Sequence, residues 1–290
     1  MSSNVVLGNA TRQNLLSLQG INSNISTAQN HLATGLKVAS AVDNAVLFFQ
    51  SQSLLNRAND LSERKSQIDQ GISSLTTATQ ATQSVVGILQ QLQGLLNSAK
   101  TETAAQRAAT SKQFDTLSVQ LNNLVNDASY QGLNLVNSTA STLTLQFSIT
   151  STSILKIHGF NQQISKLVTG AVKLSKASNL ASHLISVGFS KVSAYGTSLF
   201  DKAFNTLQTA IFAAQSQAQS LGGNVTFLQT RLSFTSQYAA TLQGGSDKLV
   251  VADVNVESTN LVTLQTRQSL AIQSLSIATQ SEQAVLRLFH

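Results

Sequence analysis

The residues that could carry out acid–base, nucleophilic or metal chemistry are few in this chain and lie far apart. The four histidines occupy positions 31, 158, 183 and 290, without the spacing that metal ligands share. No serine stands in a Gly-x-Ser-x-Gly elbow, which would expose a nucleophilic hydroxyl on a strained turn. Paired carboxylates, a phosphate-binding glycine loop and a His-Glu-x-x-His helix are also missing. We therefore predict a protein that is not an enzyme and has no catalytic residue, metal ligand or cofactor.

The composition narrows the class of protein further. The 290 residues include no proline, cysteine or tryptophan, and only 10% of them are charged. The lack of cysteine excludes disulfides, cysteine-ligated zinc and a thiol nucleophile. The lack of proline fits long uninterrupted helices, because a proline costs about 3 kcal/mol inside a helix. With so little charge, the surface is rich in amides and hydroxyls, which favours association between identical copies.

Hydrophobic periodicity predicts helices in both halves of the chain. The clearest pattern is a heptad seam in the C-terminal half, typical of a coiled coil. Gly222 and Gly223 lie inside this seam and are expected to be tolerated there, with a flexible joint as the alternative. Gly244 and Gly245 lie where the seam stops, so we expect the helix to end there. The seam consists of Phe204, Leu207, Ile211, Ala214, Ala218, Leu221, Val225, Leu228, Leu232, Thr235, Ala239 and Leu242.

The middle of the chain differs from its ends. Residues 143–149 alternate between apolar and polar side chains, which predicts a strand, and residues 154–157 are its expected hairpin partner. Residues 150–202 contain six lysines and one acid, a net charge of +5 that is nearly the whole +6 of the chain. A nucleic-acid-binding module is one interpretation. We favour a solvated outer patch, because the lysines are widely spread and lack arginines and interleaved aromatic rings.

The first 20 residues lack the basic segment and apolar core of a cleavable signal peptide. The strongest apolar run, residues 45–49, is far shorter than the roughly 18 residues of a membrane span. We therefore expect that the protein does not associate with a membrane. If it is exported, we expect an export route that does not use a cleavable signal peptide.

Several stretches resemble the terminal regions of bacterial flagellins. Residues 31–45 (HLATGLKVASAVDNA) are similar to the N-terminal signature of that family, with a bend carried by Gly35, Leu36, Asp43 and Asn44. Residues 127–135 (DASYQGLNL) resemble the aromatic-Asn-Gly segment that ends its N-terminal coiled coil. Residues 252–257, 263–270 and 284–289 resemble its last helix and terminus. The resemblance covers about 135 N-terminal and 90 C-terminal residues, in the family's order.

This resemblance implies a mainly α fold, in which long antiparallel coiled-coil helices from both chain ends accompany a small β-hairpin and a short central insert. Residues 1–44 and 251–290 would be inner terminal helices, disordered in the monomer. Residues 45–140 and 197–250 would be an outer coiled-coil domain, and residues 141–196 the hairpin and a surface-exposed insert. The implied function is a secreted subunit that polymerises into the extracellular flagellar filament for motility. The alternative within the same family is a hook–filament junction protein, and a basic nucleic-acid-binding module is a remote one.

The implied partners are further copies of the chain, the flagellar cap and hook-junction proteins, and an export chaperone on the C-terminal helix. The residues expected to pack in the filament core are Leu15, Leu18, Ile25 and Leu32 against Leu261, Leu264, Leu275 and Leu288.

Two features depart from the family's pattern. Gln91, Gly94 and Leu95 align with the stretch that many flagellins present to Toll-like receptor 5, but Gln91 replaces an arginine and Gly94 an acidic residue, which predicts weak or absent recognition by this receptor. Val46, Leu47, Phe48 and Phe49 replace a smaller Ala-Gly continuation, and their packing does not follow from the sequence.

Overall fold

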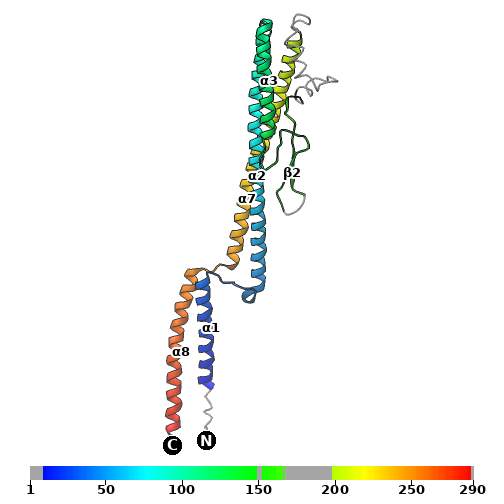
Figure 1. The fold of residues 1–290 in the computed structure, drawn as a ribbon. Helices are drawn as coiled ribbons and strands as arrows, with labels where there is room; N and C mark the ends of the chain where they lie inside the picture. Colours follow the sequence, from blue (N-terminus) through cyan, green and yellow to red (C-terminus); the bar gives the residue numbers. More distant parts are fainter. Residues whose placement is uncertain (1–8, 149–151, 166, 168–197, 289–290) are drawn as a thin grey trace. The chain divides into compact units, whose positions relative to one another are not determined.

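The structure is a computed structural model that describes residues 9–148, 152–165, 167 and 198–288 (Figure 1). The predicted mainly helical fold with a small hairpin is confirmed. Most of the predicted insert lies outside the described residues. The elements are α1 (Asn9–Thr34), α2 (Ala41–Ala99), α3 (Ala104–Asp127), β1 (Thr142–Gln146), β2 (Ile154–His158), α7 (Ser198–Val250) and α8 (Val254–Leu288).

The chain forms two compact units. Unit 1 consists of Met1–Ala58 and Ala240–His290, and unit 2 consists of Asn59–Ala239. Helices α2 and α7 therefore contribute residues to both units. The division expected from the resemblance, after residues 44 and 250, remains a prediction about the assembled protein.

Unit 2 contains the main hydrophobic core, to which α2, α3, α7 and the hairpin contribute. The largest of its side chains are fully buried, among them Ile68, Leu75, Leu89, Leu121 and Leu228. The predicted seam of α7 faces this core, since each of its residues up to Ala239 is buried or half-buried. Gly222 and Gly223 lie within the continuous helix, as expected, with open space beside them. The seam is therefore the interior face of α7. The burial of its neighbouring residues Leu221 and Leu228 offsets the low helix propensity of the two glycines.

The hairpin covers one side of this core. β1 and β2 pair antiparallel, with Leu143 opposite Ile157 and Leu145 opposite Leu155. Leu143, Leu145 and Ile157 are buried, while Thr144 and Lys156 are exposed, as strand alternation requires. A Cβ atom on Gly71 of α2 would lie 2.5 Å from a methyl group of Leu145. The missing side chain at position 71 thus lets the hairpin approach α2 closely.

Unit 1 is built from α1, α8 and the adjoining ends of α2 and α7. The helix end predicted at Gly244 and Gly245 is wrong, because α7 continues to Val250. Tertiary packing accounts for the difference. The hydroxyls of Ser246 and Ser51 lie 3.0 Å apart in a buried contact, and Leu54 of α2 lies beside Gly245. These contacts hold the glycines in a helix that their intrinsic propensity disfavours.

Candidate functional site: the paired terminal helices

The ends of the chain meet in unit 1, where α1 packs along α8 (Figure 1). Hydrogen bonds between side chains cross this pair: His31 Nδ1 lies 2.7 Å from Glu257 Oε1, and Gln268 Nε2 donates to Asn22 Oδ1 at 2.7 Å. His31 lies in the last turn of α1 and Glu257 in the first turn of α8. A protonated His31 and an ionised Glu257 would therefore each complement the dipole of its own helix as well as each other.

The residues predicted to pack in the filament core lie on these two helices. Leu18, Ile25, Leu32, Leu261, Leu264 and Leu275 are all half-buried. Leu15 is more exposed, at 39%, and the side chain of Leu288 lies outside the described part of the structure. The pair thus forms within one chain, but none of its six inward leucines and isoleucines is fully buried by it.

The predicted signature bend joins α1 to α2. Gly35 has a φ of +71°, and its carbonyl accepts a hydrogen bond from Ala252 N at 2.9 Å. Leu36 forms an isolated antiparallel bridge with Val251. Because only glycine adopts this left-handed backbone without strain, Gly35 allows α1 to end where the chain meets the start of α8.

Asp43 and Asn44 then cap the restarting helix. The Asp43 carboxylate accepts hydrogen bonds from the backbone N–H groups of Ala39 and Ser40, at 3.0 and 2.9 Å, and from the Ser40 hydroxyl. The hydrogen bonds from Ser40, chiefly that of its backbone, lower the pKa of Asp43 below its ordinary value. Asn44 has a non-helical backbone, and its side chain accepts from Leu47 N at 3.1 Å. The four signature residues therefore form a capped turn.

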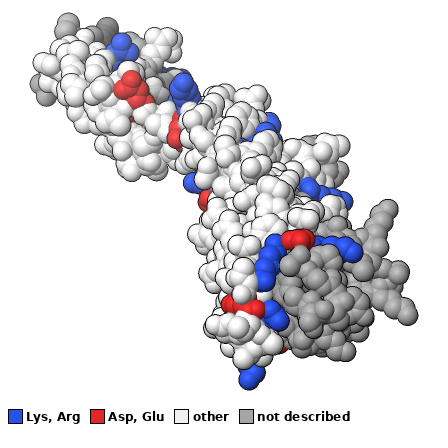
Figure 2. Space-filling view, turned by 90° about the horizontal axis from the view of Figure 1, so that it is seen from above, with Lys and Arg blue, Asp and Glu red and all other residues white. Residues whose placement is uncertain are grey.

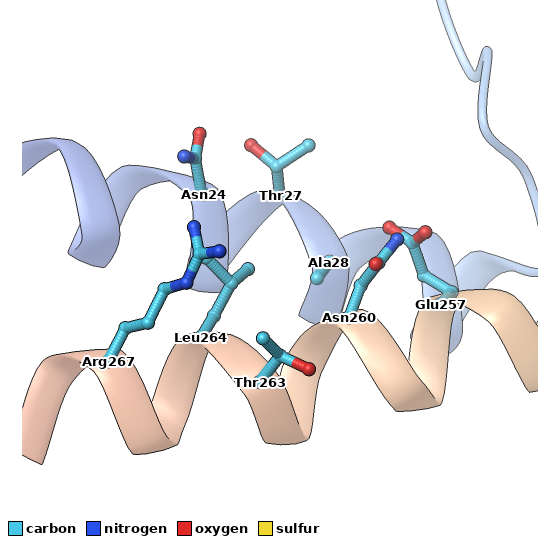
Figure 3. Close-up of a pocket in the computed structure, with 8 residues that line it drawn as sticks. All are labelled: Asn24, Thr27, Ala28, Glu257, Asn260, Thr263, Leu264 and Arg267. Atoms are coloured by element: carbon cyan, nitrogen blue, oxygen red, sulfur yellow. The ribbon is translucent and has the colours of Figure 1, made fainter.

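A groove of about 280 Å³ lies between α1 and α8 (Figure 3). It is lined by Asn24, Thr27 and Ala28 of α1 and by Glu257, Asn260, Thr263, Leu264 and Arg267 of α8. In the figure the Arg267 side chain extends toward Asn24, while Glu257 lies at the other end of the groove. The groove offers amides and charges for hydrogen bonding but contains no nucleophile–base pair.

Residues that the sequence reasoning missed lie on the rest of α8. Six of its large apolar side chains are between 52% and 62% exposed: Val254, Val256, Val262, Leu270, Ile272 and Ile277. At 100° per residue, Val262, Leu270 and Ile277 fall on the side of the helix opposite Leu261, Leu264 and Leu275. We call these three residues the outer face of α8. The sequence contained the signal for these residues. α8 has a second apolar stripe, separate from the stripe of Leu261, Leu264 and Leu275 that was predicted to pack against α1.

The surface around these elements carries little charge. On the face seen in Figure 2, lysine, arginine and acidic side chains appear singly or in small groups among uncharged residues. The receptor-like stretch lies on α2, where Gln91 and Gly94 are exposed and Leu95 is half-buried. Phe48 and Phe49, whose packing was left open, form an edge-to-face pair with ring centroids 5.5 Å apart, and Phe49 is largely exposed.

Within the described residues, no three histidine or acidic side chains are placed to hold a metal ion. None of the described helices combines the length and apolar character of a membrane span. The paired terminal helices and the uncharged outer face are features of a helical structural protein that offers association surfaces.

Comparisons with known proteins identify the family. The profile of the bacterial flagellin N-terminal helical region matches residues 4–141. The chain is 28% identical to flagellin FljK of Caulobacter vibrioides over 278 residues, which cover 95% of this chain and 94% of that protein. It is 27% identical to a flagellin of Brucella melitensis, again over 95% of both chains. A putative flagellar hook-associated protein of Vibrio parahaemolyticus shares the fold, with a TM-score of 0.61 over 72% of this chain and all of that one, at 12% identity.

The chain belongs to the bacterial flagellin family. It is a structural subunit of the extracellular flagellar filament and not an enzyme, as the sequence predicted.

Proposed function

We propose that copies of this flagellin polymerise through the α1–α8 pair, with the outer face of α8 covered by neighbouring subunits. The observation that carries the proposal is that α8 has apolar side chains on two opposite sides while a single helix packs against it in the described chain. A helix with apolar side chains on two sides buries only one of them against a single neighbouring helix, so other elements must cover the second side to remove it from water. Exposed apolar patches of this kind mark association surfaces.

The residues predicted to pack in the filament core would pair α1 with α8 before a neighbouring subunit binds. Leu18, Ile25 and Leu32 on α1, with Leu261, Leu264, Leu275 and Leu288 on α8, would hold the two helices of one subunit together, and Leu15 would extend that contact. The pair would then present the outer face of α8 and the polar groove to the next subunit. Apolar burial would supply the stability of the contact, and the amides and charges of the groove would fix its register.

The experiment compares two exposed substitutions in seeded polymerisation. Leu270→Ser with Ile277→Ser removes apolar side chains from the outer face of α8. Val119→Ser is the matched control, because Val119 is equally exposed but lies on α3 in unit 2. All three side chains are exposed, so each variant is expected to fold normally. The double variant is expected to stop elongating on filament seeds while the control elongates, and normal elongation by both would contradict the proposal.

The division of the assembled protein follows from the same idea. Residues 1–44 and 251–290 would form the inner filament core and order on assembly. Residues 45–140 and 197–250 would form the outer coiled-coil layer, with residues 141–196 on its surface. The capping residues at 40–44 would then mark the junction between the two layers.

The outer face of α8 would also serve partners that this subunit meets outside the filament. An export chaperone would bind α8 by laying its apolar side into a groove, and so prevent premature polymerisation. The cap and hook-junction proteins would contact the same terminal helices at the two ends of the filament. Mixing the chaperone of the same organism with the Leu270→Ser, Ile277→Ser variant tests the shared surface, since binding is expected to weaken.

The receptor-like stretch would be weakly recognised by Toll-like receptor 5. Gln91 and Gly94 cannot supply the charge-assisted contacts that an arginine and an acid would make there. In a receptor-reporter assay, the monomer is expected to gain potency on the double change Gln91→Arg, Gly94→Glu. Full potency of the unchanged monomer would contradict this proposal.

A further inference from the structure

A second exposed surface lies on α7, within unit 2. Phe227, Arg231, Phe234 and Tyr238 follow one another at spacings of 4, 3 and 4 along this helix. Phe147, the buried residue that follows β1, packs beneath them. The Phe227 and Phe147 rings meet edge to face with centroids 6.0 Å apart, and the Phe234 and Tyr238 rings stack at 6.0 Å. We call these five residues the aromatic stripe.

Arg231 is the centre of the aromatic stripe. Its guanidinium carbon lies 5.1 Å from the centroid of Phe147 and 5.3 Å from that of Phe234. Its Nε atom is buried without a hydrogen-bond acceptor, and no carboxylate within the described ranges pairs with the group. The rings thus hold the guanidinium in place, and its charge lacks a counter-charge in this part of the subunit.

The aromatic stripe is distinct from the buried seam of α7. Phe227 is 50% exposed and Phe234 is 53% exposed, whereas Leu228 and Thr235, one residue further along, are buried in the core of unit 2. Phe147, the other ring against Arg231, is buried, so the arginine lies between the core and the two half-exposed rings. An arginine held beside exposed aromatic rings has the composition of an interface hot spot. Arginine is suited to such a place, because its N–H groups match a carboxylate in a bidentate manner.

We propose that the aromatic stripe docks a second copy of this chain, whose unit 2 supplies a carboxylate to Arg231. The proposal rests on the chain being a filament subunit, but it uses neither α1 nor α8. An open-ended polymer needs contacts between two different patches of the subunit, because a patch that binds itself closes a dimer. An arginine on α7 that binds an acid elsewhere on the next copy meets this requirement.

Unit 2 carries the complementary acids. Five of its carboxylates form no ion pair and accept no side-chain hydrogen bond within the described part of the chain: Asp60, Glu63, Asp69, Asp115 and Asp127. All five lie on α2 or α3, so docking on α7 would be heterologous. Subunits in a filament are held at high local concentration, which favours such a contact over one with a free protein.

The test measures the critical concentration for elongation of the full chain on filament seeds. Arg231→Met keeps the length of the side chain but removes its charge, and it is expected to raise the critical concentration about tenfold. Arg64→Met is the matched control for net charge, because Arg64 bonds to Gln67 on its own helix, and it is expected to elongate as the unchanged protein does. Elongation by Arg231→Met at the unchanged critical concentration would overturn the proposal.

A second arm separates docking from a structural role of Arg231 in its own subunit. Arg231→Glu is combined in one chain with one of the five acids changed to lysine, so that every contact in the filament carries the reversed pair. Recovery of elongation by one of these double variants supports the proposal and identifies the partner acid, because none of the five acids pairs with Arg231 within the described part of its own chain. Failure of all five double variants, with the monomers folded by circular dichroism, overturns it. If α8 variants elongate normally while Arg231 variants fail, the proposed role of α8 is wrong and this contact stands.

Discussion

The two units of this flagellin bury their apolar side chains to very different extents. In unit 2, Leu75, Leu89 and Leu228 are removed from water within a single subunit. In unit 1, the corresponding residues of α1 and α8 are at most half-buried, and the outer face of α8 is exposed. The same 3-4 periodicity therefore produces a complete core in one unit and an incomplete one in the other. We therefore expect unit 2 to be stable as a monomer, and we propose that unit 1 depends on neighbouring copies.

Removal of residues 271–290 is expected to have the largest effect on this comparison. It deletes Leu275, Ile277 and Leu288 and leaves the whole core of unit 2 in place. Polymerisation is expected to be lost, while the thermal unfolding of unit 2, followed by circular dichroism, stays unchanged. Normal filaments from the truncated chain would show that α8 is not the polymerisation surface.

A pair of leucine substitutions measures how tightly each of the two units is packed in the monomer. Leu89→Ala removes a fully buried side chain and is expected to lower the free energy of unfolding by about 3 kcal/mol. Leu264→Ala on half-buried α8 is expected to cost about 1 kcal/mol or less. Chemical denaturation of the monomers checks both values. Equal losses would mean that unit 1 is as well packed as unit 2.

Replacing either of two glycines of unit 1 by alanine is expected to change its stability, in opposite directions for the two positions. Gly35→Ala forces a Cβ atom into a left-handed backbone at φ +71° and should destabilise the bend by about 1 kcal/mol. Gly20→Ala lies inside α1 with open space beside it and should stabilise the helix by a similar amount, about 1 kcal/mol. Helix content of the monomers at intermediate temperature reports both changes. A loss with Gly20→Ala would show that the free face of α1 is occupied.

The smallest expected effect concerns the capping carboxylate of Asp43. Because its hydrogen bonds lower the pKa in the folded state, its stabilising contribution is present above the unfolded pKa of about 4 and is lost as the pH falls through the lowered value. Asp43→Asn should therefore melt below the unchanged protein at neutral pH, and the gap should close in acid. A gap that is constant from pH 7 to pH 2 would exclude the carboxylate as its cause.

The sequence alone was sufficient to predict which face of α7 and which hairpin enter the interior of unit 2. The seam from Phe204 to Ala239 could be assigned because its partners belong to the same subunit, so that periodicity and burial coincide. The hairpin predicted from alternation at residues 143–149 and 154–157 is confirmed, with its strands at Thr142–Gln146 and Ile154–His158.

The predictions from the sequence are wrong or incomplete where contacts between residues far apart in the chain determine the structure. Gly244 and Gly245 were predicted to end a helix, but Ser51 and Leu54, nearly 200 residues earlier, hold them in it. Phe227, Arg231, Phe234 and Tyr238 were missed because the seam beside them gave the stronger signal. Both surfaces proposed to bind neighbouring copies, on α7 and α8, are second stripes of a helix. The first stripe of α7 is packed in the core of its own unit, and the first stripe of α8 is half-buried against α1.

Hydrogen exchange of backbone amides, compared between monomer and filament, tests most directly whether unit 1 depends on its neighbours. Amides of α2 and α7 around Leu75, Leu89 and Leu228 are predicted to be protected in both states. Amides between Val256 and Ile277 of α8 are predicted to exchange rapidly in the monomer and to become protected in the filament. If α8 were already as protected as α2 in the monomer, or stayed unprotected in the filament, unit 1 would not be completed by neighbouring copies.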